Sequence, residues 1–246
     1  MFDSPEAIRD FIARGWIGVP GTKLRREDEK KAKELVGFLR EVAFLLAQPR
    51  ARTGAIVDAA AGKGYVGVAI AMHAGRRVSF MERDPKRAAA IEAAADALSV
   101  PRDRIDALAV DVGDRAAWPD APALVVSLHA CGDATDRVIA ESVAARARAI
   151  LVAPCCVAGD LPAARRAAAR AEATGLDRHA EVRRRLVEGF VLGERILALE
   201  AAGYQVDVVP FAAPTVTPYN VAIRATAAPA PERMRRARES LDRLSS

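Results

Sequence analysis

The sequence predicts a doubly wound α/β fold, in which a mostly parallel seven-stranded sheet ends in an antiparallel hairpin and helices precede the first strand. Between residues 55 and 153, short apolar runs alternate with helical stretches, a pattern typical of parallel sheets covered by helices. Two further strands, 204–211 and 220–226, are joined by a Pro-rich loop without a helix, which predicts the hairpin.

The N-terminal segment, residues 1–48, is expected to be helical and to pack on the α/β domain. Ser4 and Pro5 have the order of an N-cap and a first helical residue, so a short helix should begin here. Residues 16–22 contain two glycines and a proline and are predicted as a loop. Apolar residues at helical spacing then predict one long amphipathic helix over 25–48.

The elements of the α/β domain follow from the period of their apolar residues. The domain is expected to span 49–228, and the Arg-rich tail, 229–246, should form a helix at the margin of the fold. Residues 160–202 should be helical with a break near Gly175. The predicted strands before the hairpin are 55–58, 77–81, 105–110, 123–128 and 149–153, and the helices between them are 65–74, 85–98 and 134–146.

The composition is that of one globular domain, since 51% of the 246 residues are hydrophobic and 28% are charged. The longest uncharged run in the middle of the chain, 149–159, is well short of the roughly 18 residues that span a membrane. The N-terminus has acids where a secretory signal has bases, and three cysteines cannot form a disulfide framework. We therefore expect a cytoplasmic protein without membrane association.

The net charge of +5 and the pI of about 9.4 raise the question of a nucleic-acid partner. Bases gather in three stretches, 23–41, 160–188 and 232–243, but acids are interleaved in each of them. A nucleic-acid surface needs a contiguous basic face, whereas alternating charge is typical of a solvated helix surface. The sequence favours the solvated surface for these stretches and carries no signal for the oligomeric state.

A glycine-rich loop, DAAAGKGYVG at 58–67, follows the first predicted strand and fits two templates. One is the dinucleotide fingerprint G-x-G-x-x-G, with Glu82 as the acid that binds ribose. The other is the S-adenosylmethionine loop, D/E-x-G-x-G-x-G, with Asp58 as the acid that ends the strand. A single match to the dinucleotide template is common by chance, so the surrounding sequence has to decide between the two templates.

Three features favour the S-adenosylmethionine loop. Three alanines separate Asp58 from the first glycine, which places a pyrophosphate too far from the strand end. The terminal hairpin is foreign to an all-parallel nucleotide fold. Acids also end the second and third strands, at Glu82 and Asp111, which suits ribose hydroxyls, an adenine amino group and a sulfonium cation, although each acid alone could be an ordinary turn residue. The residues expected at the cofactor are Asp58, Gly62, Lys63, Gly64, Glu82, Asp111 and Val112.

Strands 123–128 and 149–153 should end side by side, and polar or nucleophilic side chains follow both ends. His129 is the candidate that orients or deprotonates an acceptor, because an imidazole titrates near neutrality. Asp133 has the position of an N-cap as readily as that of an acceptor-site residue. Buried thiols are common core residues, and a zinc site here would lack C-x-x-C pairing, so no metal is expected. The acceptor-site candidates are Cys131, Asp133, Cys155 and Cys156.

Four motifs carry a family resemblance: DAAAGKGYVG, SLHACGDATD, APCC and TPYNVAIR. They resemble the methyltransferase-domain family that includes methyltransferase-like proteins and the tRNA ribose methyltransferase of the acceptor stem. The resemblance implies a Rossmann-like class I methyltransferase fold and S-adenosylmethionine as cofactor. Two departures stand out, since Ala60 replaces the first loop glycine and Val157-Ala158 follow the paired cysteines where some members carry histidines.

The resulting hypothesis is methyl transfer from S-adenosylmethionine to an oxygen or nitrogen acceptor, aided by His129. The resemblance and the basic pI favour RNA, either tRNA or rRNA, although no motif indicates it. One alternative is a pyrimidine C5 RNA methyltransferase that uses a cysteine thiolate, suggested by Pro154-Cys155, but that pair follows strand five where the pattern belongs on strand four. Another alternative is a cofactor-binding partner protein without turnover.

Overall fold

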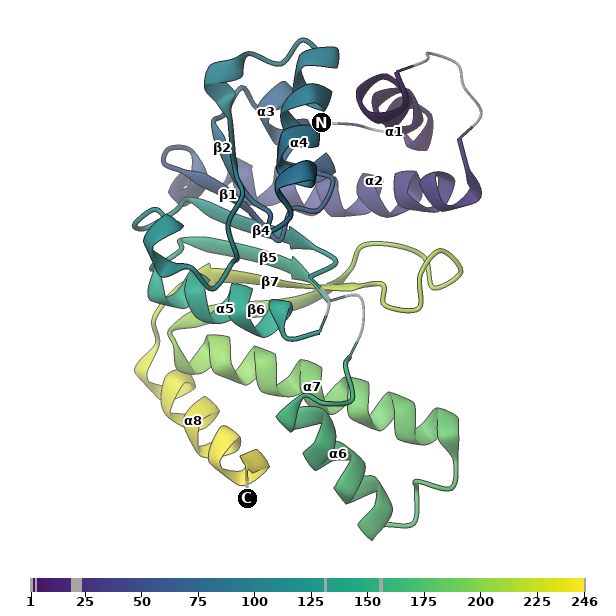
Figure 1. The fold of residues 1–246 in the computed structure, drawn as a ribbon. Coiled ribbons are helices and arrows are strands. Elements are labelled where there is room, and N and C mark those ends of the chain that lie inside the picture. Colours follow the sequence, from purple (N-terminus) through teal and green to yellow (C-terminus); the bar gives the residue numbers. More distant parts are fainter. Residues whose placement is uncertain (1, 3, 19–23, 131, 155–156, 246) are drawn as a thin grey trace.

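A single mixed sheet forms the centre of the computed structural model, which describes residues 2, 4–18, 24–130, 132–154 and 157–245 (Figure 1). The strand order is β3-β2-β1-β4-β5-β7-β6. Five strands run parallel, and β7 lies antiparallel between β5 and β6. The strands are β1 (Ile56–Ala59), β2 (Val78–Met81), β3 (Ile105–Leu108), β4 (Leu124–Leu128), β5 (Ala149–Ala153), β6 (Tyr204–Pro210) and β7 (Val221–Ala227).

This topology confirms the predicted seven-stranded, doubly wound sheet and its antiparallel hairpin. The chain builds outward from β1 to β3 and then returns to place β4 on the other side of β1. In an open α/β sheet, ligands bind beyond the carboxyl ends of the strands where the order reverses in this way. A ligand site is therefore expected at the carboxyl ends of β1 and β4.

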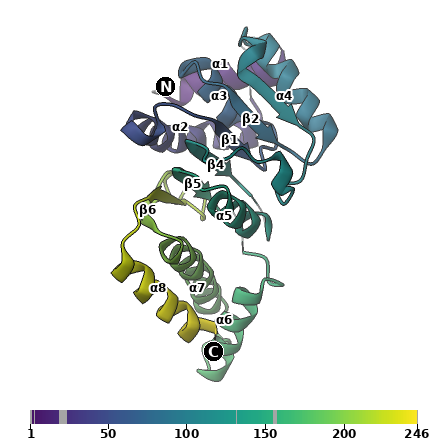
Figure 2. The same cartoon turned by 90° about the vertical axis from the view of Figure 1, so that its left-hand side faces the viewer.

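Helices cover both faces of the sheet, as the edge-on view shows (Figure 2). On one face, apolar residues of β1, β2, β4 and β5 pack against α1 to α4. On the other face, the same strands and β7 pack against α5 and α7, and α8 lies along α7 (Figure 2). The helices are α1 (Pro5–Ile12), α2 (Arg26–Ala47), α3 (Tyr65–His73), α4 (Pro85–Ala97), α5 (Ala134–Ala144), α6 (Pro162–Ala173), α7 (Ala180–Ala201) and α8 (Pro231–Ser245).

The predicted elements agree with the structure to within a few residues, with one difference near the N-terminus. Ser4 caps α1 by accepting a hydrogen bond from the backbone N–H of Ala7, at 3.3 Å. The helix then continues as a π-helical turn, Ala13–Ile17, where the sequence predicted that a loop begins at residue 16. The indole of Trp16 packs against the ring of Phe11, with 5.1 Å between ring centroids, and this contact holds the extra turn on α1.

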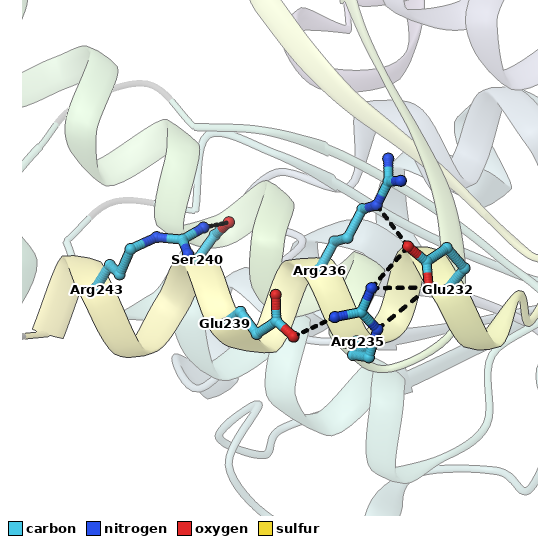
Figure 3. Close-up of polar contacts among 6 residues, drawn as sticks. All are labelled: Glu232, Arg235, Arg236, Glu239, Ser240 and Arg243. Atoms are coloured by element: carbon cyan, nitrogen blue, oxygen red, sulfur yellow. Dashed lines mark hydrogen bonds and ion pairs between the residues drawn. The ribbon is translucent and has the colours of Figure 1, made fainter.

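The Arg-rich tail forms α8, and two of the five arginines of this helix pair with its own glutamates (Figure 3). Arg235 pairs with Glu232 and Glu239, and Arg236 pairs with Glu232, all at helical i,i+3 or i,i+4 spacing. The interleaved acids of this stretch therefore do what the solvated-surface interpretation expects. Among the helices of the described residues, none is long and apolar enough to cross a membrane.

Helix α2 is fixed to the rest of the domain by a close approach at Gly37. A Cβ atom there would lie 1.6 Å from the carbonyl oxygen of Phe211, a residue at the start of the connection between β6 and β7. The rings of Phe38 and Phe211 pack edge to face beside this point, with 5.9 Å between centroids. Only glycine leaves room for the backbone of that connection.

We predict opposite effects for two glycine-to-alanine substitutions in helices. Gly37→Ala should lower the free energy of unfolding by about 1–3 kcal/mol, because the backbone of Phe211 must move. At Gly189 in α7, an added Cβ atom would meet no atom within 4 Å. Gly189→Ala should therefore raise the free energy of unfolding by about 0.5–1 kcal/mol, because alanine lowers the entropy of the unfolded chain. Urea unfolding measures both variants, and an undiminished stability of Gly37→Ala would contradict this packing.

Candidate functional site

The loop between β1 and α3 turns sharply by using the left-handed backbone region three times. Gly62 and Gly64 have φ values of 58° and 72°. Ala60 also lies in this region, at 54°, where a non-glycine residue costs roughly 1–2 kcal/mol. The alanine that departs from the family motif therefore adopts the conformation that a glycine would adopt more easily.

Two carboxylates hold the ends of this loop. The Asp58 Oδ2 atom accepts a hydrogen bond from the Gly67 N–H at 2.8 Å, and the Glu82 Oε2 atom accepts one from the Gly62 N–H at 2.8 Å. The second oxygen of Glu82 accepts from the backbone N–H of Asp84 at 3.0 Å. The acids that the sequence assigned to a ligand thus also bind the backbone of the loop.

The glycines of the motif have separate structural tasks. A Cβ atom at Gly67 would lie 2.2 Å from the Phe80 ring, and one at Gly64 would lie 2.7 Å from Ile91. Gly64 is therefore a packing residue that does not line the cavity described below. A Cβ atom at Gly62 would meet nothing within 4 Å, so the loop is open at that residue.

Asp58 is fully buried in a surrounding that disfavours its charge. Burial, together with the nearby charge of Glu82, raises the pKa of its carboxyl to about 8 against the lowering effect of the Gly67 N–H. Asp58 is consequently protonated at neutral pH in the protein as described. An approaching cation would favour its ionised form.

A cavity of about 640 Å³ opens beside the loop, at the carboxyl ends of the strands. Its wall combines several acids with bases from α2, α4 and α5, and its size falls in the range of small-molecule sites. Of the residues predicted from the sequence, those that line it are Asp58, Gly62, Lys63, Glu82, Asp111, Val112, His129 and Asp133. The predicted acceptor residues Cys131, Cys155 and Cys156 lie outside the described residues.

Asp111 and Asp133 meet at a shared arginine. The Asp111 Oδ1 atom accepts from the Gly113 N–H at 2.8 Å and from Arg137 at 3.3 Å, and Arg137 also pairs with Asp133 at 2.8 Å. Asp133 occupies the N-cap position of α5, but its side chain makes no capping hydrogen bond. The pairing with Arg137 replaces the capping role that its sequence position suggested.

His129 follows β4 in a strained conformation, with φ at 70°. Its backbone N–H donates to the Ala153 carbonyl at 3.1 Å, which fixes the residue to the end of β5. Its Nε2 atom lies 2.9 Å from the Oε2 atom of Glu34, a buried residue of α2. Lys31 donates to the same carboxylate oxygen at 2.7 Å.

Sequence reasoning missed Glu34, although a signal for it existed. It precedes Phe38 by one helical turn, so it is an acid on the apolar face of α2, where a charged residue needs a partner. Burial alone would raise the pKa of Glu34, but hydrogen bonds from His129 and Lys31 outweigh burial and hold the pKa at about 2. Glu34 is therefore ionised at every pH near neutrality.

The N-terminal segment forms part of the cavity wall. The indole N–H of Trp16 donates to the carbonyl of Lys63 at 2.9 Å, and its ring packs on Tyr65. Glu27, Asp28 and Lys31 of α2 line the cavity itself. The sequence placed this segment on the domain but gave no sign that it touches the glycine loop.

The described residues contain no group of three or more histidine, cysteine, aspartate or glutamate side chains that could hold a metal ion. The acids around the cavity are instead engaged by backbone N–H groups and by Arg137. What the arrangement offers chemically is a pocket with several carboxylates and one imidazole whose Nε2 atom faces an ionised acid.

Comparison with known proteins identifies one matching family model, described as a methyltransferase domain, which covers residues 30–159 and thus more than half of the chain. No curated protein sequence matches significantly. The solved structures that share the fold include magnesium protoporphyrin IX methyltransferase from Synechocystis with bound S-adenosylmethionine. The two are 11% identical, the TM-score is 0.56, and the match covers 92% of this chain and 98% of that one.

A protein from Corynebacterium glutamicum also shares the fold, at 16% identity and a TM-score of 0.51, with 94% of this chain and 92% of that chain covered. At these identities the two structures support the fold alone. They agree with the mixed seven-stranded sheet and the hairpin that the sequence predicted.

We predict that Asp58 makes the stability of the protein fall as pH rises. Its carboxyl ionises near pH 3.8 in the unfolded chain and near 8 in the folded chain, so the folded state holds an extra proton between these values. Asp58→Asn should remove this dependence, which amounts to about 1 kcal/mol per pH unit.

Urea unfolding from pH 5 to pH 8, without added ligand, measures the effect. Asp103→Asn, a change at an exposed carboxylate, serves as the control and should keep the slope of the original protein. An equal slope for Asp58→Asn and the original protein would show that Asp58 is ionised throughout this range.

Proposed function

The chain belongs to the methyltransferase domain family, and from this premise we propose that it transfers a methyl group from S-adenosylmethionine to an oxygen or nitrogen of its acceptor. The choice of cofactor rests on one observation, namely which atoms accept hydrogen bonds from the backbone N–H groups of the glycine loop. Those of Gly62 and Gly67 already donate to side-chain oxygens of Glu82 and Asp58. They are not available to a phosphate.

The same observation argues against a dinucleotide. A pyrophosphate binds at such a loop because free N–H groups and the positive end of the following helix face it. Here acids take these donors, and the charge of Glu82 would repel an anion. A sulfonium cation and neutral ribose hydroxyls suit this surrounding, so the residues present fit S-adenosylmethionine.

The proposed roles of the cavity residues follow from their chemistry. When bound, S-adenosylmethionine supplies an electrophilic methyl group. Each carboxylate oxygen has room for a second hydrogen bond, so Glu82 can bind ribose hydroxyls while it holds the loop. Asp111 and the backbone beside Val112 would bind the adenine, and Asp58 would lose its proton in favour of the cationic ligand.

His129 is the proposed base that receives the proton of the acceptor. Because Glu34 is ionised and accepts hydrogen bonds only, the Nε2 atom of His129 must carry the proton that lies between them. In the neutral imidazole, Nδ1 is then the acceptor nitrogen. Glu34 acts as a positioning residue, since it fixes the tautomer of the imidazole and the orientation of its ring.

RNA, either tRNA or rRNA, is the proposed acceptor class, and the cytoplasm is the proposed place of reaction. The support is the resemblance of the motifs and the pI of about 9.4. The alternative of a cysteine-dependent C5 reaction depends on Cys131, Cys155 and Cys156, which lie outside the described residues, and the adduct experiment below tests it. Methyl transfer then depends on proximity and orientation in the cavity together with the base.

We predict that the protein binds S-adenosylmethionine and S-adenosylhomocysteine but not NAD. Glu82→Ala should weaken this binding about 10- to 100-fold, because it removes a carboxylate from the ribose and releases the Gly62 N–H. Glu92→Ala, at a half-buried acid of α4 that pairs with Arg102 outside the cavity, is the matched control and should bind normally. Calorimetry decides, and NAD binding without a response to the methyl donor would exclude the proposed cofactor.

We predict that His129→Ala lowers methyl transfer to RNA roughly 100-fold while cofactor affinity is kept, because the proton acceptor is lost. Glu34→Gln should move the pH profile of the rate, since a neutral amide fixes the imidazole differently from a carboxylate. His179→Ala, at an exposed histidine, is the control and should keep the original rate and profile.

The measurement is transfer of a labelled methyl group to purified tRNA and rRNA. Unchanged turnover of His129→Ala would remove it from the mechanism. A covalent adduct with RNA containing 5-fluoropyrimidines would replace the proposed direct transfer with thiolate chemistry.

A further inference from the structure

Three bases form a row on the outer face of α2. Arg26, Lys30 and Lys33 follow one another at i, i+4 and i+7, so their side chains lie on one side of the helix. All three side chains are exposed. Within the described part of the chain, no carboxylate forms an ion pair with any of them, and we call these three residues the basic row.

Most acids of α2 are paired with other bases or buried, although Glu27 and Glu29 lie beside the basic row in the groove described below. Glu27 pairs with Arg25 at 3.8 Å. Glu29 pairs with Arg9 at 2.7 Å, and Glu41 pairs with Arg224 at 2.7 Å. Glu34 is buried against His129. The sequence showed bases and acids interleaved in this stretch. The structure shows that the neighbouring acids, Glu27 and Glu29, are paired with Arg25 and Arg9 and not with the basic row.

The other two Arg-rich stretches behave differently. In α8, Arg235 and Arg236 pair with glutamates one turn away (Figure 3). At the start of α7, Arg184 and Arg185 pair with Glu181 in the same way. The bases left over between residues 160 and 188 come from separate segments, and they do not follow one helix face.

The basic row lines an open groove of about 930 Å³ between the start of α2 and the connection from β6 to β7, which supplies Thr215 and Val216. Both segments lie at the carboxyl edge of the sheet (Figure 1). Glu27 lines this groove and also the candidate-site cavity, so the two spaces adjoin at the first turn of α2.

We propose that the basic row binds the phosphates of base-paired RNA and thereby directs an acceptor nucleotide toward the cavity. This inference rests on the proposed function. Surfaces for nucleic acids are polar and strongly positive, whereas protein interfaces have an apolar core with aromatic residues. The described lining of the groove holds four bases and two acids, Glu27 and Glu29, both of which are paired with arginines, and its one apolar residue is Val216. This chemistry fits a phosphate backbone rather than an acidic protein.

The lack of aromatic residues along the groove also indicates the form of the RNA. Proteins that hold single strands stack the bases on aromatic side chains. The described lining of the groove has none. Bases that are already stacked in a helix need only contacts to their phosphates and sugars, which lysine and arginine side chains supply.

The test is the salt dependence of RNA binding by a variant that carries Arg26→Gln, Lys30→Gln and Lys33→Gln. A labelled RNA hairpin is the probe, and an unpaired oligouridine of the same length is compared with it. The slope of log affinity against log salt should become shallower by about 2 to 3, which is the loss of three phosphate contacts. Affinity for S-adenosylhomocysteine should not change.

The matched control carries Arg52→Gln, Arg165→Gln and Arg183→Gln, the same change in charge at exposed bases outside both cavities. It should keep the original slope. An equal loss in the control would show that binding follows overall charge, and this would overturn the role of the row. Tighter binding of oligouridine or of polyglutamate than of the hairpin would overturn the assignment to base-paired RNA.

The failure of this inference differs from a failure of the proposed function. If the protein binds S-adenosylhomocysteine but not the hairpin, the basic row is not an RNA surface. The protein then remains a candidate methyltransferase for another acceptor. A protein that binds the hairpin through the row but not S-adenosylhomocysteine contradicts the proposed cofactor.

Discussion

The hydrogen bonds from Gly62 and Gly67 to the carboxylates of Glu82 and Asp58 determine the character of the site. They bend the loop after β1 and occupy the donors that would otherwise attract an anion. Burial raises the pKa of Asp58 at this position, and the nearby charge of Glu82 adds to the rise. A cavity built in this way favours a cationic ligand with hydroxyl groups over a phosphate, and the rest of the functional argument depends on that preference.

Helix α2 contacts both the proposed catalytic base and the proposed RNA surface. On its inner face, Glu34 orients His129 at the end of β4. On its outer face, it presents three exposed bases beside the groove that adjoins the cavity. One helix before the first strand therefore contributes to both the proposed base and the proposed RNA surface, although the boundary of the N-terminal segment at residue 48 stays a prediction.

The doubly wound sheet and the hairpin could be predicted because they depend on local patterns, namely the period of apolar residues and the absence of a helix between β6 and β7. The acids at or near the ends of β1, β2 and β3 could be recognised from the same patterns. The pair of Glu34 and His129 could not be predicted, since 95 residues separate them and only the packing of α2 on the sheet brings them together. Nor could the φ of Ala60, which the surrounding loop imposes.

The most direct test of the central claim is a crystal structure with S-adenosylhomocysteine. The account predicts the nucleoside in the cavity beside the loop, with its ribose on Glu82 and its adenine near Asp111, and with the Gly62 and Gly67 N–H groups still bound to carboxylates. A ligand bound outside this cavity, or a loop whose N–H groups turn away from Glu82 and Asp58 toward the ligand, would contradict it.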